Sequence, residues 1–433
     1  MAKLDIFVHM QKRLSCSIFR AFLPRYLFLM LMLLLVSCQT NPGNNALRGR
    51  ITIWHSWSSA EIVELEAAFD QFEEIHPDVQ IVSVNLPEDQ FLEELIKAGQ
   101  AGLGPSLLIG KDEWIRGLAE SGLIRPLMPD DFSRLFFNRH NRDLTQYKGQ
   151  TFGVPLSLAP RALFYNKNLV TEPPDTLEAL LLEAADGNQV AFVPRFEEAY
   201  WGIQTFGEGL FNEPGKLTLE DSGFAEWLRW LDIAQSAPGV ILNVDDQSLL
   251  ELFASEQIAY YVAAPGSQKL ISALIDEENP FEFGVAPLPA GPNGLSGPLL
   301  LAETIMFYSF TSPEEKEAAN ELAIFLVNQQ QSIRFMRELN RIPANPSVRV
   351  DPRIYPIVSG FAQQATTAVV IPIYLSSELL IAAGNRAYAS ALSGLLTPTE
   401  AVCLFAQEVA AGMEDDDFEI VLPPGCEGSN EQR

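Results

Sequence analysis

The residue types that most often carry catalysis are poorly arranged for it in this chain. Gly104 and Gly110 precede Lys111 with one residue too many between them for a phosphate-binding P-loop. The step from Gly207 to Gly209 lacks the third glycine of a dinucleotide-binding loop, and no Gly-x-Ser-x-Gly elbow occurs. The sequence therefore offers neither a nucleotide-binding loop nor the strained turn that presents an activated serine.

Metal ligands are equally sparse. Beyond residue 38 the chain holds three histidines, His55, His76 and His140, at unrelated spacings, and two cysteines near its end. Zinc sites draw three or four such ligands from short, regular spacings. We expect neither a metal nor a cofactor.

Two pairs of adjacent carboxylates remain as candidates for chemistry. They are Asp112 with Glu113 and Glu197 with Glu198, among 56 acidic residues. Glycoside hydrolysis uses two carboxyl groups on either side of the bond that breaks, and their separation in space cannot be read from sequence. Either pair could serve a hydrolase, or both could be solvated acidic loops.

The cysteines indicate where the protein works. An apolar run over residues 26–36 follows a cationic stretch and ends in Ser37 and Cys38, which predicts a bacterial lipoprotein signal peptide over residues 1–37 and a lipid on Cys38. A transmembrane anchor is the alternative, but the run falls short of the ~20 residues that a spanning helix needs. We expect an extracytoplasmic protein, lipid-anchored to a bacterial membrane in the periplasm or at the cell surface, with a flexible polar tether over residues 38–49.

Cys403 and Cys426 lie in the part of the chain beyond the signal, in a compartment where disulfides persist. A bridge between them would pin the tail to the last helix, and two unpaired thiols are the alternative. Their spacing does not decide between these two states.

Composition and charge narrow the partners. The chain has 433 residues, of which 47% are hydrophobic, and a net charge of -27. This length allows two domains with separate cores. The acidic surface disfavours nucleic acid and anionic membranes as partners, because both would repel it.

The hydrophobic pattern predicts an α/β architecture. Strands over residues 51–54 and 79–84 flank a helix that Ser58 and Glu61 begin as a capping box, and this β-α-β unit favours a parallel sheet. A third strand is predicted over residues 107–109. Strands over 152–156 and 162–165 are joined by a short link, and such a pair can pass directly from one domain to another.

The second half of the chain continues the same pattern. Strands are predicted over residues 258–262 and 283–286. Ser312 and Thr397 are each followed by proline and, three residues after the cap, by glutamate, which predicts two further helix starts.

Read in order, several segments resemble the extracellular (periplasmic) solute-binding proteins, family 1, of ABC transporters, in the carbohydrate-binding group that includes the maltose and maltodextrin binders. The segment that begins at Tyr147-Lys148-Gly149 and runs to Pro155, followed by the Tyr165-Asn166-Lys167 step, is the most specific match. The first β-α unit and the segment over residues 104–124 are similar as well. The resemblance covers nearly all of the chain beyond the signal.

This resemblance implies a type II periplasmic-binding-protein fold. Two lobes, each a mostly parallel sheet flanked by helices, would be joined by multiple hinge crossings. The expected boundaries are residues 48–157 plus 291–350 for lobe 1 and 158–290 plus 351–428 for lobe 2.

Ligands of open α/β sheets bind beyond the carboxyl ends of the strands, and the resemblance points to the same loops. A sugar needs aromatic platforms beside fixed hydrogen-bonding groups. The resulting candidate ligand-binding residues are Trp54, His55, Ser56, Trp57, Asp112, Glu113, Trp114, Arg161, Glu198, Tyr200, Trp201, Gly266 and Tyr374. Gly110, Gly266 and Ala159 stand where the maltodextrin binder has two sugar-stacking tryptophans and a cleft carboxylate, so maltodextrin itself is not the expected ligand.

The implied function is that of a monomeric lipoprotein that captures a sugar or oligosaccharide between closing lobes and delivers it to ABC permease subunits. No bond is broken in this scheme, so the protein would not be an enzyme. Two alternatives stay open: a lipid-anchored glycoside hydrolase that uses paired carboxylates, and a solute-binding protein that serves a membrane sensor.

Overall fold

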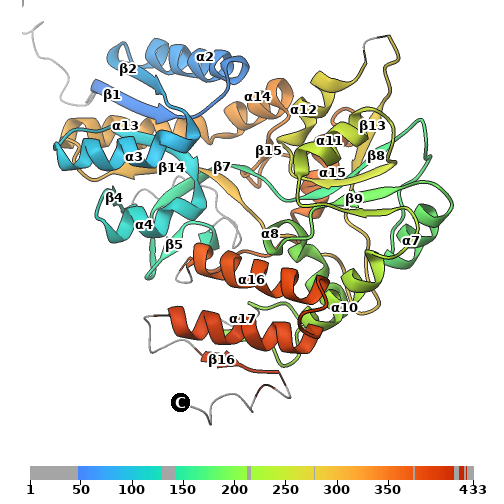
Figure 1. The fold of residues 1–433 in the computed structure, drawn as a ribbon. Coiled ribbons are helices and arrows are strands. Elements are labelled where there is room, and N and C mark those ends of the chain that lie inside the picture. Colours follow the sequence, from blue (N-terminus) through green and yellow to red (C-terminus); the bar gives the residue numbers. More distant parts are fainter. Residues whose placement is uncertain are drawn as a thin grey trace, which may run out of the picture. The chain divides into compact units, whose positions relative to one another are not determined.

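Two β-sheets, each covered by helices, organise the chain (Figure 1). The computed structural model describes residues 47–128, 142–211, 216–276, 278–373, 376–413, 419–423 and 426. Residues 48–433 form one unit, separate from residues 1–47. The predicted signal peptide, Cys38 and Tyr374 lie outside the described residues.

The first sheet has the strand order β15-β7-β14-β3-β1-β2, and β4 pairs with β14. Its strands are β1 (Arg48–His55), β2 (Asp78–Asn85), β3 (Leu107–Lys111), β4 (Ile124–Arg125), β7 (Gly153–Leu158), β14 (Ala302–Tyr308) and β15 (Ile342–Pro343). The helices that accompany it along the chain are α2 (Ser59–Ile75), α3 (Glu88–Gln100), α4 (Ile115–Glu120), α13 (Pro313–Leu326) and α14 (Gln329–Leu339). A short hairpin, β5 (Gln146–Tyr147) and β6 (Gln150–Thr151), precedes β7.

The second sheet has the order β11-β9-β12-β8-β13. Its strands are β8 (Ala162–Asn166), β9 (Val190–Phe192), β11 (Val240–Leu242), β12 (Tyr260–Ala263) and β13 (Phe283–Ala286). The helices of this half are α7 (Leu177–Ala185), α8 (Phe196–Ala199), α9 (Ile203–Phe206), α10 (Phe224–Ala234), α11 (Asp246–Ala254), α12 (Ser267–Leu274), α15 (Pro356–Gln364), α16 (Ser377–Leu392) and α17 (Pro398–Gly412). Trp201, Trp227 and Tyr388 are fully buried in the core that these helices share.

In both sheets most strands run in one direction, in line with the predicted mostly parallel sheets, and a few antiparallel strands make them mixed. In the first sheet β1 pairs in parallel with β2 and β3, whereas β14 is antiparallel to β3, β4 and β7. In the second, β9 is parallel to β11 and β12, whereas β8 is antiparallel to β12 and β13. The parallel pairs come from local β-α-β crossovers, and the antiparallel pairs are made where the chain enters or leaves a sheet.

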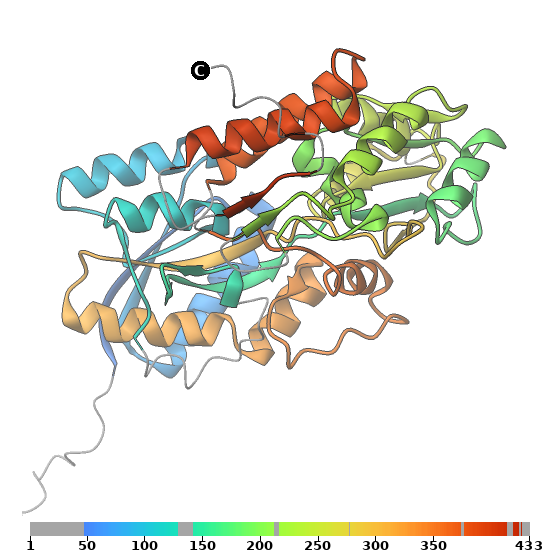
Figure 2. The ribbon, with the colours of Figure 1, turned by 90° about the horizontal axis from the view of Figure 1, so that it is seen from below.

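The chain passes between the sheets at the predicted link. β7 belongs to the first sheet and β8 to the second, so residues 159–161 cross from one to the other. Residues 287–301 return from β13 to β14, and the Ala159 amide donates to the Leu301 carbonyl at 2.8 Å, which ties the two crossings together. Figure 2 shows the two groups of strands and helices side by side, connected by these segments.

Local sequence signals set the helix starts. The capping boxes of Ser58 with Glu61, Ser312 with Glu315 and Thr397 with Glu400 are all present, as predicted. In each, the hydroxyl residue and the glutamate satisfy backbone N–H groups that have no partner inside the helix.

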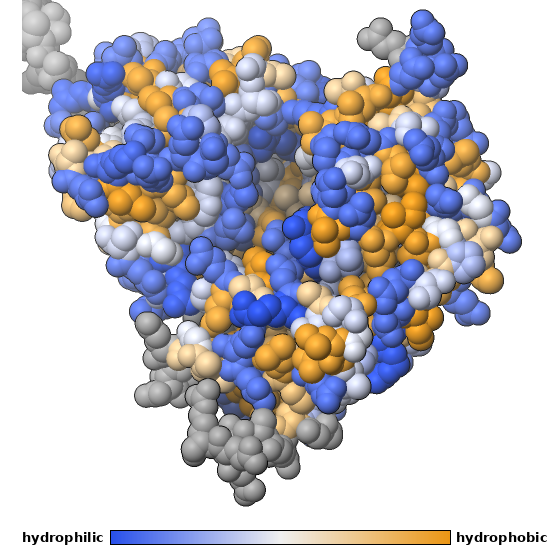
Figure 3. Space-filling view, in the orientation of Figure 1, coloured by the Kyte–Doolittle hydropathy of each residue, from blue (hydrophilic) through white to orange (hydrophobic). Residues whose placement is uncertain are grey.

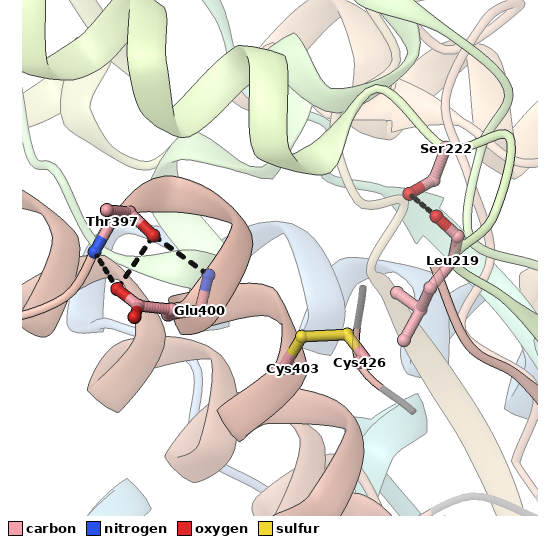
Figure 4. Close-up of a disulfide and its surroundings, with 6 residues drawn as sticks. All are labelled: Leu219, Ser222, Thr397, Glu400, Cys403 and Cys426. Carbon is pink, nitrogen blue, oxygen red and sulfur yellow. Dashed lines mark hydrogen bonds between the residues drawn. A yellow bond between two sulfur atoms is a disulfide. The ribbon is translucent and has the colours of Figure 1, made fainter. Parts of the chain in front are cut away.

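A disulfide holds the end of the chain against α17. It joins Cys403 to Cys426 across 23 residues, with a Cα–Cα distance of 5.4 Å. Figure 4 shows the bridge on α17, beyond the capping box of Thr397 and Glu400. The segment before Cys426 contains β16 (Glu419–Val421), which pairs in parallel with β10 (Lys216–Thr218).

Membrane spans and metal clusters are both absent from the part of the chain that the structure describes. None of the helices among these residues is long and apolar enough to cross a membrane. Within the same residues, no group of three or more His, Cys, Asp or Glu side chains is placed to hold a metal ion.

Candidate functional site

A cleft opens between the two sheets, and Figure 3 shows the surface hollowed there. Its volume is about 370 Å³. The first sheet and its helices contribute most of the lining, and the loop after β12 and the start of α12 contribute the facing wall through Pro265, Gly266, Gln268 and Lys269. The loops at the carboxyl ends of β1, β3 and β12 therefore border this cleft, as the rule for open α/β sheets predicts.

The end of β3 supplies an aromatic surface. Trp114 lines the cleft, and its ring lies directly over the backbone of Gly110, where a Cβ atom would come within 2.3 Å of Trp114 Cζ3. Phe91 backs the indole, with ring centroids 5.1 Å apart. The missing side chain at Gly110 thus makes room for an indole that is fixed from behind and partly exposed in front.

The same loop carries charged groups. Lys111 Nζ lies 2.6 Å from Glu88 Oε1 and 3.8 Å from Glu113 Oε1. Asp112 is buried, and its Oδ1 accepts a hydrogen bond from the Ala302 amide at 2.9 Å. Burial raises the pKa of Asp112 to about 7. Asp112 therefore fastens the loop to the start of β14 and borders the cleft at the same time.

His55, at the end of β1, is a structural residue. Its ring is fully buried, with Nε2 2.9 Å from Ser83 Oγ, and its Nδ1 faces the Trp57 amide and Asn85 Nδ2, both at 3.2 Å. Because Nδ1 meets two N–H donors, it accepts, and Nε2 carries the proton. Burial lowers the pKa of His55 to about 4, so the imidazole is neutral at pH 7.

Neither of the two tryptophans of this segment lines the cleft. Trp57 is only 3% exposed, because the Arg341 guanidinium covers its ring at 3.9 Å from the centroid. Trp54 packs edge-on against Phe91, with centroids 6.4 Å apart. Of the four residues predicted here, only Ser56 lines the cleft.

Trp57, Glu61, Glu303 and Arg341 form a cluster at the cleft, here named the rim cluster. Trp57 Nε1 donates to Glu303 Oε1 at 2.6 Å, and Arg341 pairs with both Glu303 and Glu61. Burial alone would raise the pKa of Glu61, but the Arg341 charge and hydrogen bonds from Lys269 and Ser58 outweigh it and lower the pKa to about 2. For Glu303, burial outweighs Arg341 and Trp57 and raises the pKa.

The second sheet brings further carboxylates to the site. Glu198 lies 2.9 Å from Arg195 and 3.8 Å from Arg161. The adjacent Glu197 borders a smaller, largely apolar hollow that also touches Asp112 and Glu113. Burial raises the pKa of Glu197, and the Glu198 charge adds to the effect. The two acidic pairs singled out in the sequence thus lie near one another.

Tyr200 and Trp201 were predicted to bind the ligand, but the structure places both away from the cleft. Both are fully buried and neither lines the cleft. Trp201 packs against Trp227 with centroids 4.7 Å apart, and Tyr200 packs against Phe196 at 5.4 Å. A short 3-10 turn, Tyr200–Gly202, directs these rings into the core of the second sheet.

Comparison with known proteins identifies the family. Residues 67–355, more than half of the 433, match the family model described as bacterial extracellular solute-binding protein. The chain belongs to this family. A maltotriose-binding protein of Pyrococcus abyssi is 27% identical over 351 residues, covering 75% of this chain and 73% of its own. A maltodextrin-binding protein of Bacillus subtilis is 23% identical over 370 residues, covering 80% and 85%.

Solved structures confirm the fold of this solute-binding protein. A cyclo/maltodextrin-binding protein complexed with maltotetraose superposes with a TM-score of 0.72 at 20% identity, covering 87% of this chain and all of the other. The type II periplasmic-binding fold that the sequence predicted is thus confirmed. Membership in the family also places the protein outside the cytoplasm and makes it a binder of solutes and not an enzyme.

The predicted residues of the solute-binding protein fall into three groups. Those that line the cleft are Ser56, Asp112, Glu113, Trp114 and Gly266. Arg161 and Glu198 form an ion pair of partly buried side chains. His55, Trp57, Tyr200 and Trp201 are buried, and Trp54 is partly buried and packs against the core of the first half. The charged cleft residues that sequence reasoning missed include Glu61, Lys269, Glu303 and Arg341. No local motif marks these four as cleft residues, because they come together only through tertiary structure, and the capping box that contains Glu61 predicts only a helix start.

Proposed function

We propose that this solute-binding protein captures a neutral sugar or short oligosaccharide in the cleft and delivers it to an ABC permease. Trp114 is the observation that carries this proposal. An indole held from behind by Phe91 and facing a polar cleft presents the flat apolar surface that pyranose C–H faces stack on, beside carboxylates that accept hydroxyl hydrogens. The names of the relatives, which include maltotriose, galactooligosaccharide and maltodextrin binders, support a sugar ligand.

Charge in the cleft supports a neutral sugar over an acidic one. The cations that line it, Lys111, Lys269 and Arg341, each have a carboxylate partner within 4 Å. Glu61, Glu88, Asp112, Glu113 and Glu303 line it as well. A sugar phosphate or uronate would meet more carboxylates than cations, and no cation in the lining is free of a carboxylate to receive it.

The proposed lobes have the predicted boundaries, 48–157 plus 291–350 and 158–290 plus 351–428. The division of the strands between two sheets supports them. A solute can favour closure only by contacting both lobes better in the closed state than in the open one. The lining supports such shared contacts, because the ends of β1, β3 and β14 border one side of the cleft and the start of α12 borders the other.

The anchor and the partners belong to the same proposal. A lipid on Cys38 would hold the monomer at a bacterial membrane through the tether over residues 38–49, close to permease subunits. Labelling with a radioactive or clickable fatty acid in cells should mark the wild-type protein and not the Cys38→Ala variant. Equal labelling of both would contradict the anchor.

Binding can be tested by calorimetry with maltotriose, galactobiose, glucose, glucuronate and glucose 6-phosphate. At least one neutral saccharide should bind, and Trp114→Ala should weaken its binding by about five- to thirtyfold, because a stacked aromatic contributes roughly 1 to 2 kcal/mol. Trp230→Ala is the matched control, since Trp230 stacks on Trp227 away from the cleft. Tighter binding of the two anionic sugars than of every neutral one would contradict the proposal.

A further inference from the structure

An ion pair joins the two walls of the cleft. Lys269 Nζ, on α12 of the second half, lies 2.9 Å from Glu61 Oε1, on α2 of the first. Both residues line the cleft. We propose that this pair is a latch that stabilises the approach of the two lobes, and that Lys269 is a positioning residue for closure and makes no contact with the solute. The inference rests on the proposed two-lobe function.

Glu61 is prepared for this role by its place in the capping box. Its Oε2 accepts hydrogen bonds from the Ser58 amide at 3.1 Å and the Ser58 hydroxyl at 2.7 Å. The other oxygen, Oε1, is thereby turned toward Arg341 and Lys269. The carboxylate that receives Lys269 is therefore fixed in orientation before the lysine arrives, which reduces the entropy lost on pairing.

Every other partner of Glu61 comes from the first half. Arg341 precedes β15, covers the Trp57 ring and pairs with Glu303 on β14. Of the contacts that Glu61 makes, separating the two sheets would break only the one with Lys269. The contacts within the rim cluster would remain. Whether Lys269 and Glu61 are in contact therefore depends mainly on the distance between the two walls of the cleft.

Because the pair is partly buried, it should stabilise the apposed lobes more than a fully exposed surface ion pair would. The side chain of Glu61 is 18% exposed and that of Lys269 is 48% exposed. A pair in this setting should shift the balance between separated and apposed lobes by about two- to fivefold. Salt should weaken it, because one partner remains open to solvent.

The first test needs no sugar. Small-angle X-ray scattering of the ligand-free protein in low salt should give a larger radius of gyration for Lys269→Gln than for wild type, and Lys269→Arg should restore the wild-type value. Lys97→Gln is the matched control, because Lys97 makes a 2.7 Å pair with Glu93 within α3. A wild-type radius in Lys269→Gln would overturn the latch, even if no sugar proves to bind.

The second test separates a latch from a direct contact. The affinity for maltotriose, measured by calorimetry, should fall about two- to fivefold in Lys269→Gln. It should fall no further when Lys269→Gln is added to Glu61→Gln, because the second change then removes a pair that is already broken. A full additional loss in the Glu61→Gln background would mean that Lys269 touches the sugar, and would overturn the proposal. If maltotriose does not bind, galactobiose or glucose takes its place in this test; if none of the three binds to the wild type, the sugar assignment fails and the scattering result still decides on the latch.

Discussion

The indole of Trp114 occupies the space that a side chain on Gly110 would fill. A Cβ atom there would approach Trp114 Cζ3 to 2.3 Å and Cε3 to 2.5 Å. A glycine at the end of β3 and a tryptophan four residues later thus act together, and the aromatic wall of the cleft depends on both.

Gly110→Ala should displace this ring. We expect a loss of about 1 to 3 kcal/mol in the free energy of unfolding from overpacking, together with a fall in sugar affinity comparable to that of Trp114→Ala. Urea unfolding and calorimetry measure the two effects. Gly117→Ala on α4 is the control: nothing lies within 4 Å of its Cβ position, so stability should hold or rise by about 0.5 kcal/mol. Unchanged affinity in Gly110→Ala would show that the ring position does not matter.

Asp112 should make stability fall as pH rises. Burial raises its pKa to about 7, above the ordinary value of 3.8, so the folded chain keeps a proton that the unfolded chain has lost. This contribution is fully present below about pH 4 and is lost by about pH 7, with a slope of at most about 1.4 kcal/mol per pH unit. Asp112→Asn keeps an oxygen for the Ala302 amide and removes the charge, so its stability relative to wild type should increase from pH 4 to 7 and then level off. A difference independent of pH, measured by urea unfolding, would contradict the assignment.

His55 should make the free energy of unfolding rise with pH, opposite to the effect of Asp112. Burial lowers its pKa from 6.5 to about 4, so the unfolded state takes up the proton first and stability falls as pH drops through this window. The trends of Asp112 and His55 oppose each other between about pH 4 and 6.5. In Asp112→Asn, where the opposing contribution of Asp112 is gone, the free energy of unfolding should therefore change with pH over that window more positively than in the wild type. A His55 ring whose NMR shifts titrate near pH 6.5 would refute this expectation.

The disulfide should stabilise the fold without affecting the site. Closing a loop of 23 residues between Cys403 and Cys426 restricts the unfolded chain by about 3 kcal/mol. The Cys403→Ala, Cys426→Ala double variant should lose about this much free energy of unfolding and so unfold at a lower urea concentration. It should still bind sugar within twofold of wild type, since neither cysteine lines the cleft. A large loss of sugar affinity in a folded double variant would contradict this prediction, because it would mean that the disulfide affects binding in the cleft.

Much of the fold was predictable because it depends on short-range signals. The capping boxes at Ser58, Ser312 and Thr397, the first β-α-β unit and the link at residues 159–161 all appear where the pattern places them. Each involves residues within a few turns or one crossover of each other. The loop after β3 was predictable for the same reason, because strand ends in an open sheet point to its binding edge.

The orientation of individual rings was not predictable. Trp57 and Trp114 both follow strands of the first sheet, yet Arg341 covers one ring and a glycine leaves room for the other at the cleft. Tyr200 and Trp201 follow an acidic pair that borders a hollow, yet a single 3-10 turn directs them into the core. Sequence supplies the aromatic residues, and the packing of distant segments determines which of them meet solvent.

Sequence alone determined several strands and capped helix starts, a short link between two strands that contains residues 159–161, and several loops that border the cleft, because these follow from local periodicity and from the geometry of a β-α-β unit. Only the tertiary structure decided which charges meet in the cleft. Glu61 and Arg341 are 280 residues apart in the chain and form an ion pair at 3.2 Å, and Lys269 joins them from the other sheet. Electrostatic pairing depends on separation in space. For Glu61 and Arg341 that separation is set by packing within the first half of the structure, and for Lys269 it is set by how close the second half lies.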